Sequence, residues 1–366
     1  MGDKSRAGNG RVGSRSEIAT SCPISSDRNI RVVAITGGQN VPSRRFRIHA
    51  IVPYLAKRSI ELTELCPTFS RYPPSSRLLR LPWFAAALVE RLTFLYRSTG
   101  YDAVILQREM ISTLPTLERL LPKPRILDVD DAIYLRRNGR AAEYIARSCS
   151  LVVCGNHYLA EKFSQWNSNV VVIPTGVDTD QLRTIEIRNN VESPIIGWIG
   201  TAGNYRYLES IVPALSKVLG TFKNSRLQII SNQFPHFLEH LGEQLEFILW
   251  RPGIENDLLP RFTIGIMPLV DSEWARGKCA FKMLQYMAAG VPVVASPVGA
   301  NGVVLAEGHI GFAADSTQDW IEALIGLLED FELASELGVN GRKLVEEKYS
   351  LKQVAMSWAN VLLHRI

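Results

Sequence analysis

Short apolar runs alternate with helical segments from Asn29 almost to the end of the chain, and this alternation limits the fold more than any other feature. Fully apolar runs bounded by turns are typical of strands that are buried on both faces of a parallel sheet. The first expected strands are Arg31–Thr36, Ala103–Leu106, Arg125–Asp128 and Leu151–Cys154. A helix is expected over Arg45–Arg58, with Phe46, Ile48, Ile51, Val52 and Leu55 on its buried stripe. The pattern predicts an α/β domain that is doubly wound.

The alternation restarts at Pro194, after a polar connection, and predicts a second doubly wound domain that faces the first across a cleft. Its expected strands are Ile195–Ile199, Leu227–Ser231, Phe247–Leu249, Ile264–Met267 and Pro292–Ala295. We therefore divide the chain into an N-terminal domain at 29–185 and a C-terminal domain at 186–350. Residues 1–28 are poor in large apolar side chains and are expected to be a flexible leader. The last segment, 351–366, is expected to be a helix with Val354, Trp358, Val361 and Leu362 on one face.

The composition agrees with two domains and indicates in which cellular compartment the protein is expected. The chain has 366 residues, of which 46% are hydrophobic and 21% charged, which is enough for two cores. Its five cysteines show neither disulfide nor zinc spacing, as expected for reduced thiols of a cytoplasmic protein. No run approaches the roughly 20 apolar residues of a membrane-spanning helix. His236 and His240 have the spacing of a metal clamp but no third ligand, so no metal is expected.

The segment Gly277–Gly302 is the best pointer to function. Apolar residues recur there at helical spacing, Gly290 ends the helix and Pro292 prevents its continuation before a buried strand. Gly277 and Lys278 are expected at the N-terminus of the helix, where free N–H groups, the helix dipole and an ammonium group suit a diphosphate. Lys282 shares the polar face with Lys278, and Gln285 is placed to bond ribose hydroxyls.

This segment resembles the donor site of the group 1 (family 4) retaining glycosyltransferases. Three further stretches resemble the same family in the right order: Val172–Asp178, Ile196–Gly200 and Gly311–Phe312, with a family-like ending through Tyr349–Ser350. The resemblance implies the GT-B fold, in which two Rossmann-like domains face each other across a cleft. It also implies a nucleoside diphosphate sugar as donor, bound by the C-terminal domain, and an acceptor bound on the N-terminal side. The last helix of the family crosses back to the N-terminal domain, so the resemblance implies the same packing for 351–366.

The chain departs from the family at the charged positions of the donor site. The family's E-x7-E motif places glutamates at the positions of Gly277 and Gln285, so both carboxylates are missing. The arginine and lysine that the family places after the first donor-domain strand correspond to Thr201 and, for the second, Arg206. Gly200 still lets backbone amides approach a phosphate. Lys278 and Lys282 are expected to compensate by neutralising the leaving diphosphate.

The acceptor wall has its own candidates. Asp130 and Asp131 follow a strand and are placed to orient or deprotonate an acceptor hydroxyl, unless Asp131 caps the next helix and Asp128 is satisfied by backbone amides. The resemblance adds a glycine-rich loop that faces donor and acceptor. Further acceptor-side candidates are Gly37, Gly38, Arg44, Arg47 and His157. Glu255–Asp257 matches a family loop near the nucleotide base, with helix capping as the equal alternative.

Charge and hydrophobicity leave a membrane alternative open in the N-terminal domain. Residues 44–97 hold ten Lys or Arg against three Glu, which favours an anionic partner. The helix expected over Pro82–Arg97 has an apolar body with basic flanks, so it either packs in the core or lies on a membrane surface. If the helix lies on a membrane, we expect peripheral association at the inner membrane face and a lipid-linked acceptor. No nucleic-acid-binding motif accompanies the charge.

The sequence thus predicts a glycosyltransferase that moves a sugar from a nucleoside diphosphate sugar to the hydroxyl of a saccharide or lipid-linked acceptor. Retention of configuration is implied by the resemblance alone, and no cofactor beyond the donor co-substrate is expected. Cell-envelope or polysaccharide synthesis is the expected setting. Two alternatives remain: a sugar-nucleotide epimerase of the same architecture, and a sugar-nucleotide-binding protein that has lost catalysis.

Overall fold

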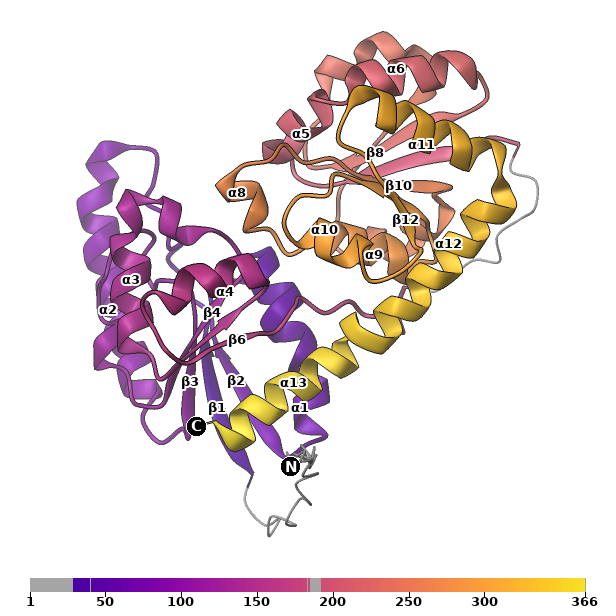
Figure 1. Cartoon of the computed structure of the whole chain (residues 1–366). Helices are drawn as coiled ribbons and strands as arrows, with labels where there is room; N and C mark the ends of the chain where they lie inside the picture. Colours follow the sequence, from indigo (N-terminus) through magenta and orange to yellow (C-terminus); the bar gives the residue numbers. More distant parts are fainter. Residues whose placement is uncertain (1–28, 40, 183, 185–191, 366) are drawn as a thin grey trace, which may run out of the picture.

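The computed structural model describes residues 29–39, 41–182, 184 and 192–365, and within them it forms two doubly wound α/β domains (Figure 1). The leader expected at 1–28 and most of the connection before Pro194 lie outside the described residues. The strands of the N-terminal sheet run in the order β2-β1-β3-β4-β5-β6, and every pairing is parallel. Their bounds are β1 Ile30–Ile35, β2 Ile60–Leu65, β3 Ala103–Gln107, β4 Arg125–Val129, β5 Leu151–Cys154 and β6 Val170–Val172.

The C-terminal sheet is built in the same way. Its six parallel strands run in the order β12-β11-β10-β7-β8-β9. Their bounds are β7 Ile195–Ile199, β8 Arg226–Ser231, β9 Leu245–Leu249, β10 Ile264–Met267, β11 Val293–Ala295 and β12 Gly311–Ala313. The predicted fold class is confirmed. The three strands that the sequence analysis did not expect, β2, β6 and β12, all lie at sheet edges.

Helices cover both faces of each sheet. In the N-terminal domain α2 (Arg80–Arg97), α3 (Arg140–Ser148) and α4 (His157–Ser164) pack on one face, while α1 (Val52–Ala56) and α13 (Leu351–His364) pack on the other. In the C-terminal domain one face is covered mainly by α6, α11 and α12, and the other by α9 and α10. The remaining helices are α5 Tyr205–Glu209, α6 Val212–Thr221, α7 Ile254–Leu258, α8 Glu273–Arg276, α9 Phe281–Ala288, α10 Ala300–Leu305, α11 Thr317–Glu329 and α12 Phe331–Leu344.

The helix expected over Arg45–Arg58 is not continuous. It divides into a π-helical turn at Arg44–Ile48, a 3-10 turn at His49–Ile51 and α1. Pro53 has no N–H to donate to the His49 carbonyl, which accepts from the Val52 N–H in a tighter turn instead. The division leaves Ile48, Ile51 and Leu55 fully buried, as the apolar pattern predicts, while Phe46 is only half-buried beside the cleft.

The chain crosses between the domains a second time at its end, where α13 lies across the N-terminal domain (Figure 1). Val354 and Trp358 of α13 are buried in the N-terminal core together with Leu55. The crossing point is held by backbone hydrogen bonds, because the Val177 N–H donates to the Tyr349 carbonyl and the Leu351 N–H donates to the Val177 carbonyl. The two domains are therefore tied together at two places in the chain.

Candidate functional site

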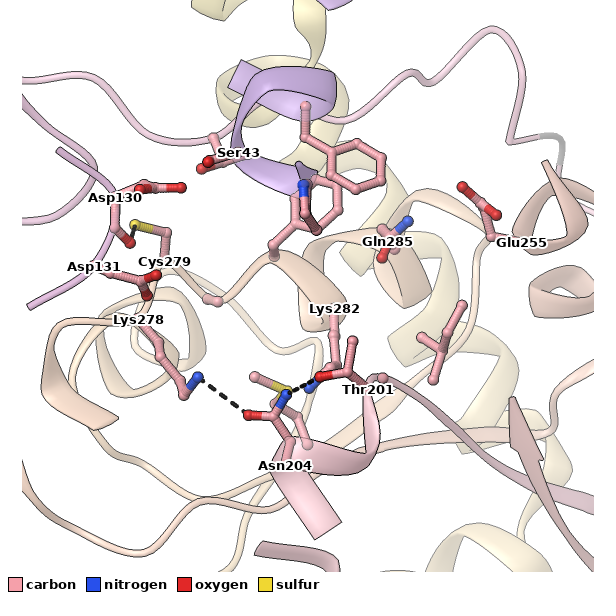
Figure 2. Close-up of a pocket in the computed structure, with 18 of the residues that line it drawn as sticks. Ser43, Asp130, Asp131, Thr201, Asn204, Glu255, Lys278, Cys279, Lys282 and Gln285 are labelled. Carbon is pink, nitrogen blue, oxygen red and sulfur yellow. Dashed lines mark hydrogen bonds between the residues drawn. The ribbon is translucent and has the colours of Figure 1, made fainter. Parts of the chain in front are cut away.

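A cavity of about 540 Å³ lies between the domains, at the carboxyl ends of strands from both sheets (Figure 2). Ligands of open α/β sheets bind at this edge. The N-terminal wall is formed by Pro42, Ser43, Phe46, Arg47, Asp130, Asp131 and Thr175. The C-terminal wall is formed by Ile199, Gly200, Thr201, Asn204, Asn232, Trp250, Glu255, Met267, Lys278, Cys279, Ala280, Phe281, Lys282 and Gln285. A second cavity, of about 420 Å³, shares Phe46, Glu255, Phe281 and Gln285 with the first.

Two lysines four residues apart, Lys278 and Lys282, give the C-terminal wall its positive charge. Lys278 Nζ donates to Asn204 Oδ1 at 3.3 Å, and Lys282 Nζ lies 5.0 Å from the centre of the Trp198 ring. Burial and the neighbouring charge of Lys278 lower the pKa of Lys282 to about 7. Burial also lowers the pKa of Lys278, although Asp131 opposes this shift. Within the described residues no carboxylate pairs with Lys282. An anion in the cavity would restore its charge.

The helix expected to carry both lysines starts later than the sequence analysis predicted. Helix α9 begins at Phe281, so Gly277 and Lys278 precede it in a loop and the prediction that they form its N-terminus is wrong. Ala280 takes a left-handed conformation, with φ of 52°, which ends the loop before the helix. The Asn156 amide of the facing domain donates to the carbonyls of Arg276 and Lys278 and holds the loop in place. No side chain caps α9, so its first N–H groups remain available at the cavity.

The turn after β7 forms the opposite side of the lysine pair. A Cβ atom at Gly200 would lie 2.8 Å from Cε of Lys282 and 2.7 Å from the Trp198 ring, so glycine leaves room for the lysine. Thr201 accepts a hydrogen bond of 3.1 Å from Asn204, which also accepts from Lys278 (Figure 2). Asn204 thus links the turn to the lysine loop. The sequence analysis did not select it, although it lies within the glycine-rich turn.

The two positions that carry glutamate in the resembling family have different surroundings. Gln285 is buried, with 6% of its surface exposed, and its side chain lines the cavity. Gly277 lies against the N-terminal domain, where an added Cβ would meet the backbone nitrogen of Ala132 at 2.9 Å and its Cβ at 2.8 Å. A glutamate therefore does not fit at position 277 in this arrangement. The loop that fills the space carries Asp130 and Asp131.

Asp130 and Asp131 both line the cavity and share one arginine. Arg108, which follows β3, donates to a carboxylate oxygen of each. Burial alone would raise the pKa of both carboxyls. For Asp130 the charges of Arg108 and Arg47 more than offset burial, so its pKa is lowered. For Asp131 burial and the charge of Asp130 outweigh Arg108, so its pKa is raised. The pair thus combines an ionised carboxylate with one that binds a proton more readily.

Asp131 does not cap the next helical turn, because the cap position falls at Ala132 and no side chain bonds there. That alternative is wrong. Asp128 is fully buried and is held by Arg47, whose Nη2 lies 2.6 Å from Oδ1, and not by backbone amides as the other alternative had it. Arg47 also donates to Thr175 and to the Ile173 carbonyl. Its nitrogens are engaged within the protein, so we assign Arg47 a supporting position in the cavity wall.

Five other acceptor-side or donor-side candidates do not line the cavity. Arg44 pairs with Glu64 at 2.6 Å, and Gly37 packs against the Arg71 side chain. His157 is an exposed first residue of α4. Arg206 is exposed and donates to the Tyr207 hydroxyl at 2.8 Å. Gly38, next to Gly37, likewise lies outside the lining and needs its glycine for a φ of 128°.

Glu255 adds a contact between the domains that the sequence does not reveal. It is a buried residue within α7, where Arg45 of the facing domain donates to its Oε1 at 2.6 Å. The cap of α7 is Gly253 without a side-chain bond, so the capping alternative for this segment is wrong. Phe46 and Phe281 meet beside the pair with ring centres 4.3 Å apart. These contacts join the two walls between the two cavities.

Two doubly wound domains that meet at a cavity with lysines on one wall and carboxylates on the other have the architecture of GT-B glycosyltransferases. Residues 193–330 match the family model described as "Glycosyl transferases group 1". A curated relative, the D-inositol 3-phosphate glycosyltransferase of Corynebacterium aurimucosum, is 23% identical over 47% of this chain and 46% of its own. The matched part thus spans about half the length of that relative.

Solved structures match the whole fold at low sequence identity. HepE of Anabaena, in complex with UDP and glucose, has a TM-score of 0.68 and is 14% identical, covering 92% of this chain and 100% of its own. The sucrose-phosphate synthase of Thermosynechococcus elongatus has a TM-score of 0.69 and is 13% identical, covering 91% of this chain and 98% of its own. The chain is therefore similar to the group 1 glycosyltransferases, in sequence through its C-terminal domain and in fold throughout.

Proposed function

We propose that the protein transfers a sugar from a nucleoside diphosphate sugar to an acceptor hydroxyl. The lysine pair at the cavity carries the proposal, because Lys282 is desolvated, lacks a carboxylate partner among the described residues and lies in the uncapped first turn of α9. An ammonium pair and free helical N–H groups suit a diphosphate. HepE, of the same fold, is a complex with UDP and glucose.

The side chains around the cavity divide the roles. Lys278 and Lys282 neutralise the diphosphate as the bond between its oxygen and the sugar C1 breaks and the bonding electrons leave with the phosphate. Gln285 bonds the ribose hydroxyls. Asp131 faces the same space and accepts the proton of the acceptor hydroxyl as its oxygen bonds to C1, because its raised pKa suits a base. Arg108 and Asp130 hold Asp131 in position.

Three finer features belong to the same proposal. We infer that the charge on the leaving diphosphate is neutralised by Lys278 and Lys282 without a divalent metal. Among the described residues no group of three His, Cys, Asp or Glu has the arrangement of a metal site, and His236 instead pairs with Glu239. Retention of configuration and a role in cell-envelope or polysaccharide synthesis are proposed from the family resemblance. We also propose a cytoplasmic location and a saccharide or lipid-linked acceptor, in keeping with a role in cell-envelope or polysaccharide synthesis.

A nucleotide screen tests the donor site first. Thermal shift and calorimetry with UDP, GDP, ADP, dTDP and their sugars are expected to select one nucleotide. The Lys278→Ala/Lys282→Ala variant should lose this binding, whereas Lys217→Ala/Lys223→Ala, which removes two exposed lysines of the same domain, should retain it. No binding by the wild type would overturn the proposal. Binding without product in a transfer assay would instead favour a sugar-nucleotide-binding protein, in line with the glycine at position 277.

A further inference from the structure

Helix α2 exposes an apolar stripe instead of burying it. Leu81 is 81% exposed, Val89 62%, Leu92 48% and Tyr96 80%. At 3.6 residues per turn these four side chains fall within about 80° of one another around the helix axis. Leu78 and Leu79, in the turn before the helix, extend the stripe and are 88% and 57% exposed. We call these six residues the α2 stripe.

The opposite side of α2 accounts for its attachment to the domain. Ala87, Arg91 and Phe94 are buried there, and Arg91 donates to Glu90 and to the Phe69 carbonyl. The helix therefore has one face in the core and a second apolar face in solvent, so the expectation that its apolar body is buried is only half right. Large exposed apolar patches on soluble proteins mark interaction surfaces.

The charge around the stripe points to an anionic surface. Arg77, Arg80 and Arg97 are exposed near its two ends, and within the described residues none of them forms an ion pair. Glu90 is the only acidic residue between positions 69 and 101, and it is engaged by Arg91 and by the Thr68 and Phe69 N–H groups. An apolar stripe between unpaired arginines suits a helix that lies in the headgroup region of an anionic bilayer.

One end of the stripe lies at the sheet edge that carries the cavity. Because α2 follows β2 in a parallel sheet, its N-terminus and Leu78 to Leu81 are at the carboxyl edge, the edge that carries Asp130. Tyr72, in the preceding loop, contacts Arg136, whose guanidinium lies 5.9 Å from the rings of both Tyr72 and Trp274. Trp274 in turn lies 5.9 Å from Nζ of Lys278. In Figure 1, α2 occupies the side of its domain away from the C-terminal domain.

We propose that the α2 stripe docks the protein on an anionic phospholipid bilayer, with Leu78 to Leu81 inserted among the acyl chains and the three arginines at the lipid phosphates. Docking would bring the N-terminal wall of the cavity to the membrane. Given the proposed function, on which this last step rests, the acceptor would be a lipid-linked hydroxyl delivered from the bilayer surface. Binding to the membrane itself does not depend on that step.

Vesicle sedimentation with the full chain tests the proposal. The wild type is expected to bind phosphatidylglycerol vesicles and to bind phosphatidylcholine vesicles weakly. Leu81→Asn/Val89→Asn should weaken binding to the anionic vesicles by roughly tenfold or more. Val339→Asn, a change at a 61% exposed valine of α12, should leave it unchanged. Arg77→Gln/Arg80→Gln/Arg97→Gln should remove the preference for anionic lipid.

Other outcomes would overturn the proposal. These are absence of binding by the wild type, or equal binding by the Leu81→Asn/Val89→Asn variant. A dimer in analytical ultracentrifugation that the same variant dissociates, without an effect on vesicles, would assign the stripe to a second copy of the chain. Nucleotide calorimetry on the variant separates the two proposals. Intact nucleotide binding with lost vesicle binding locates the effect at the stripe, whereas vesicle binding without nucleotide binding would refute only the donor site.

Discussion

Binding of the donor diphosphate should take up a proton at Lys282. In the free protein the pKa of Lys282 is about 7, against 10.5 for an ordinary lysine, because burial and Lys278 disfavour its charge. A bound diphosphate favours the charged form and raises this pKa. Below pH 7 Lys282 is charged in both states, so affinity does not change with pH on its account. Above pH 7 the proton must be taken from solution, and affinity falls as pH rises toward the pKa of the complex.

The size of the effect follows from linkage. Affinity should weaken by up to about tenfold per pH unit, or about 1.4 kcal/mol, which is up to about 100-fold between pH 7 and pH 9. At pH 8 a group with a pKa of about 7 is mostly deprotonated, so uptake by Lys282 should approach one proton per nucleotide bound. The terminal phosphate of a nucleoside diphosphate titrates near pH 6, so the range above pH 7 isolates the lysines.

Calorimetry in two buffers of different ionisation enthalpy measures this uptake directly. The Lys282→Gln variant should lose most of one proton of uptake relative to the wild type at pH 8, and its affinity should approach that of the wild type as pH rises. Lys217→Gln, at an exposed lysine of α6, serves as the matched control and should behave as the wild type. Equal proton uptake by the wild type and Lys282→Gln would refute the assignment of a desolvated, diphosphate-facing lysine.

Three further changes have defined outcomes. Asp131→Asn should lower kcat of glycosyl transfer by roughly 10²- to 10⁴-fold with the nucleotide Kd unchanged, and an unaffected rate would remove Asp131 as the base. Gly277→Ala places a Cβ within 2.9 Å of the facing domain and should lower the free energy of unfolding by about 1–3 kcal/mol. Gly203→Ala is the control and should not lower it, because no atom lies nearer than 3.9 Å to the added Cβ. Thermal denaturation of the two variants compares them. Arg47→Met leaves Asp128 charged and buried and should cost about 3–5 kcal/mol in urea unfolding, so a neutral result would contradict the buried ion pair.

The position of the site was predictable from the sequence because it depends on local rules. Residues that directly follow buried parallel strands lie at one edge of the sheet, and this rule places Asp130, Asp131, Gly200 and Thr201 at the cavity. Helical spacing does the same for Lys282. The roles of these residues remain predictions, but their presence in one cavity follows from the strand order of each sheet.

The same rules failed where a side chain has a competing partner within the protein. Arg44 is engaged by Glu64, and Arg206 stacks on its neighbour Tyr207, so neither reaches the cavity. Glu255 reaches it because Arg45 pairs with it across the cleft. A single sequence carries no signal for such pairs. Arg108 is the exception, since it follows β3 and could have been selected by the rule that selected Asp130.

The sequence by itself determined the two doubly wound domains, because the alternation of apolar strands and helices leaves no other way to bury both faces of each sheet. Only the tertiary structure decided how the cavity is charged, since the pKa of Lys282 and the unequal pair Asp130 and Asp131 depend on burial and on neighbours from other strands. It also shows that a carboxylate side chain would not fit at position 277, because Ala132 of the facing domain fills that space. Desolvation and steric exclusion depend on through-space distance, which sequence separation does not encode.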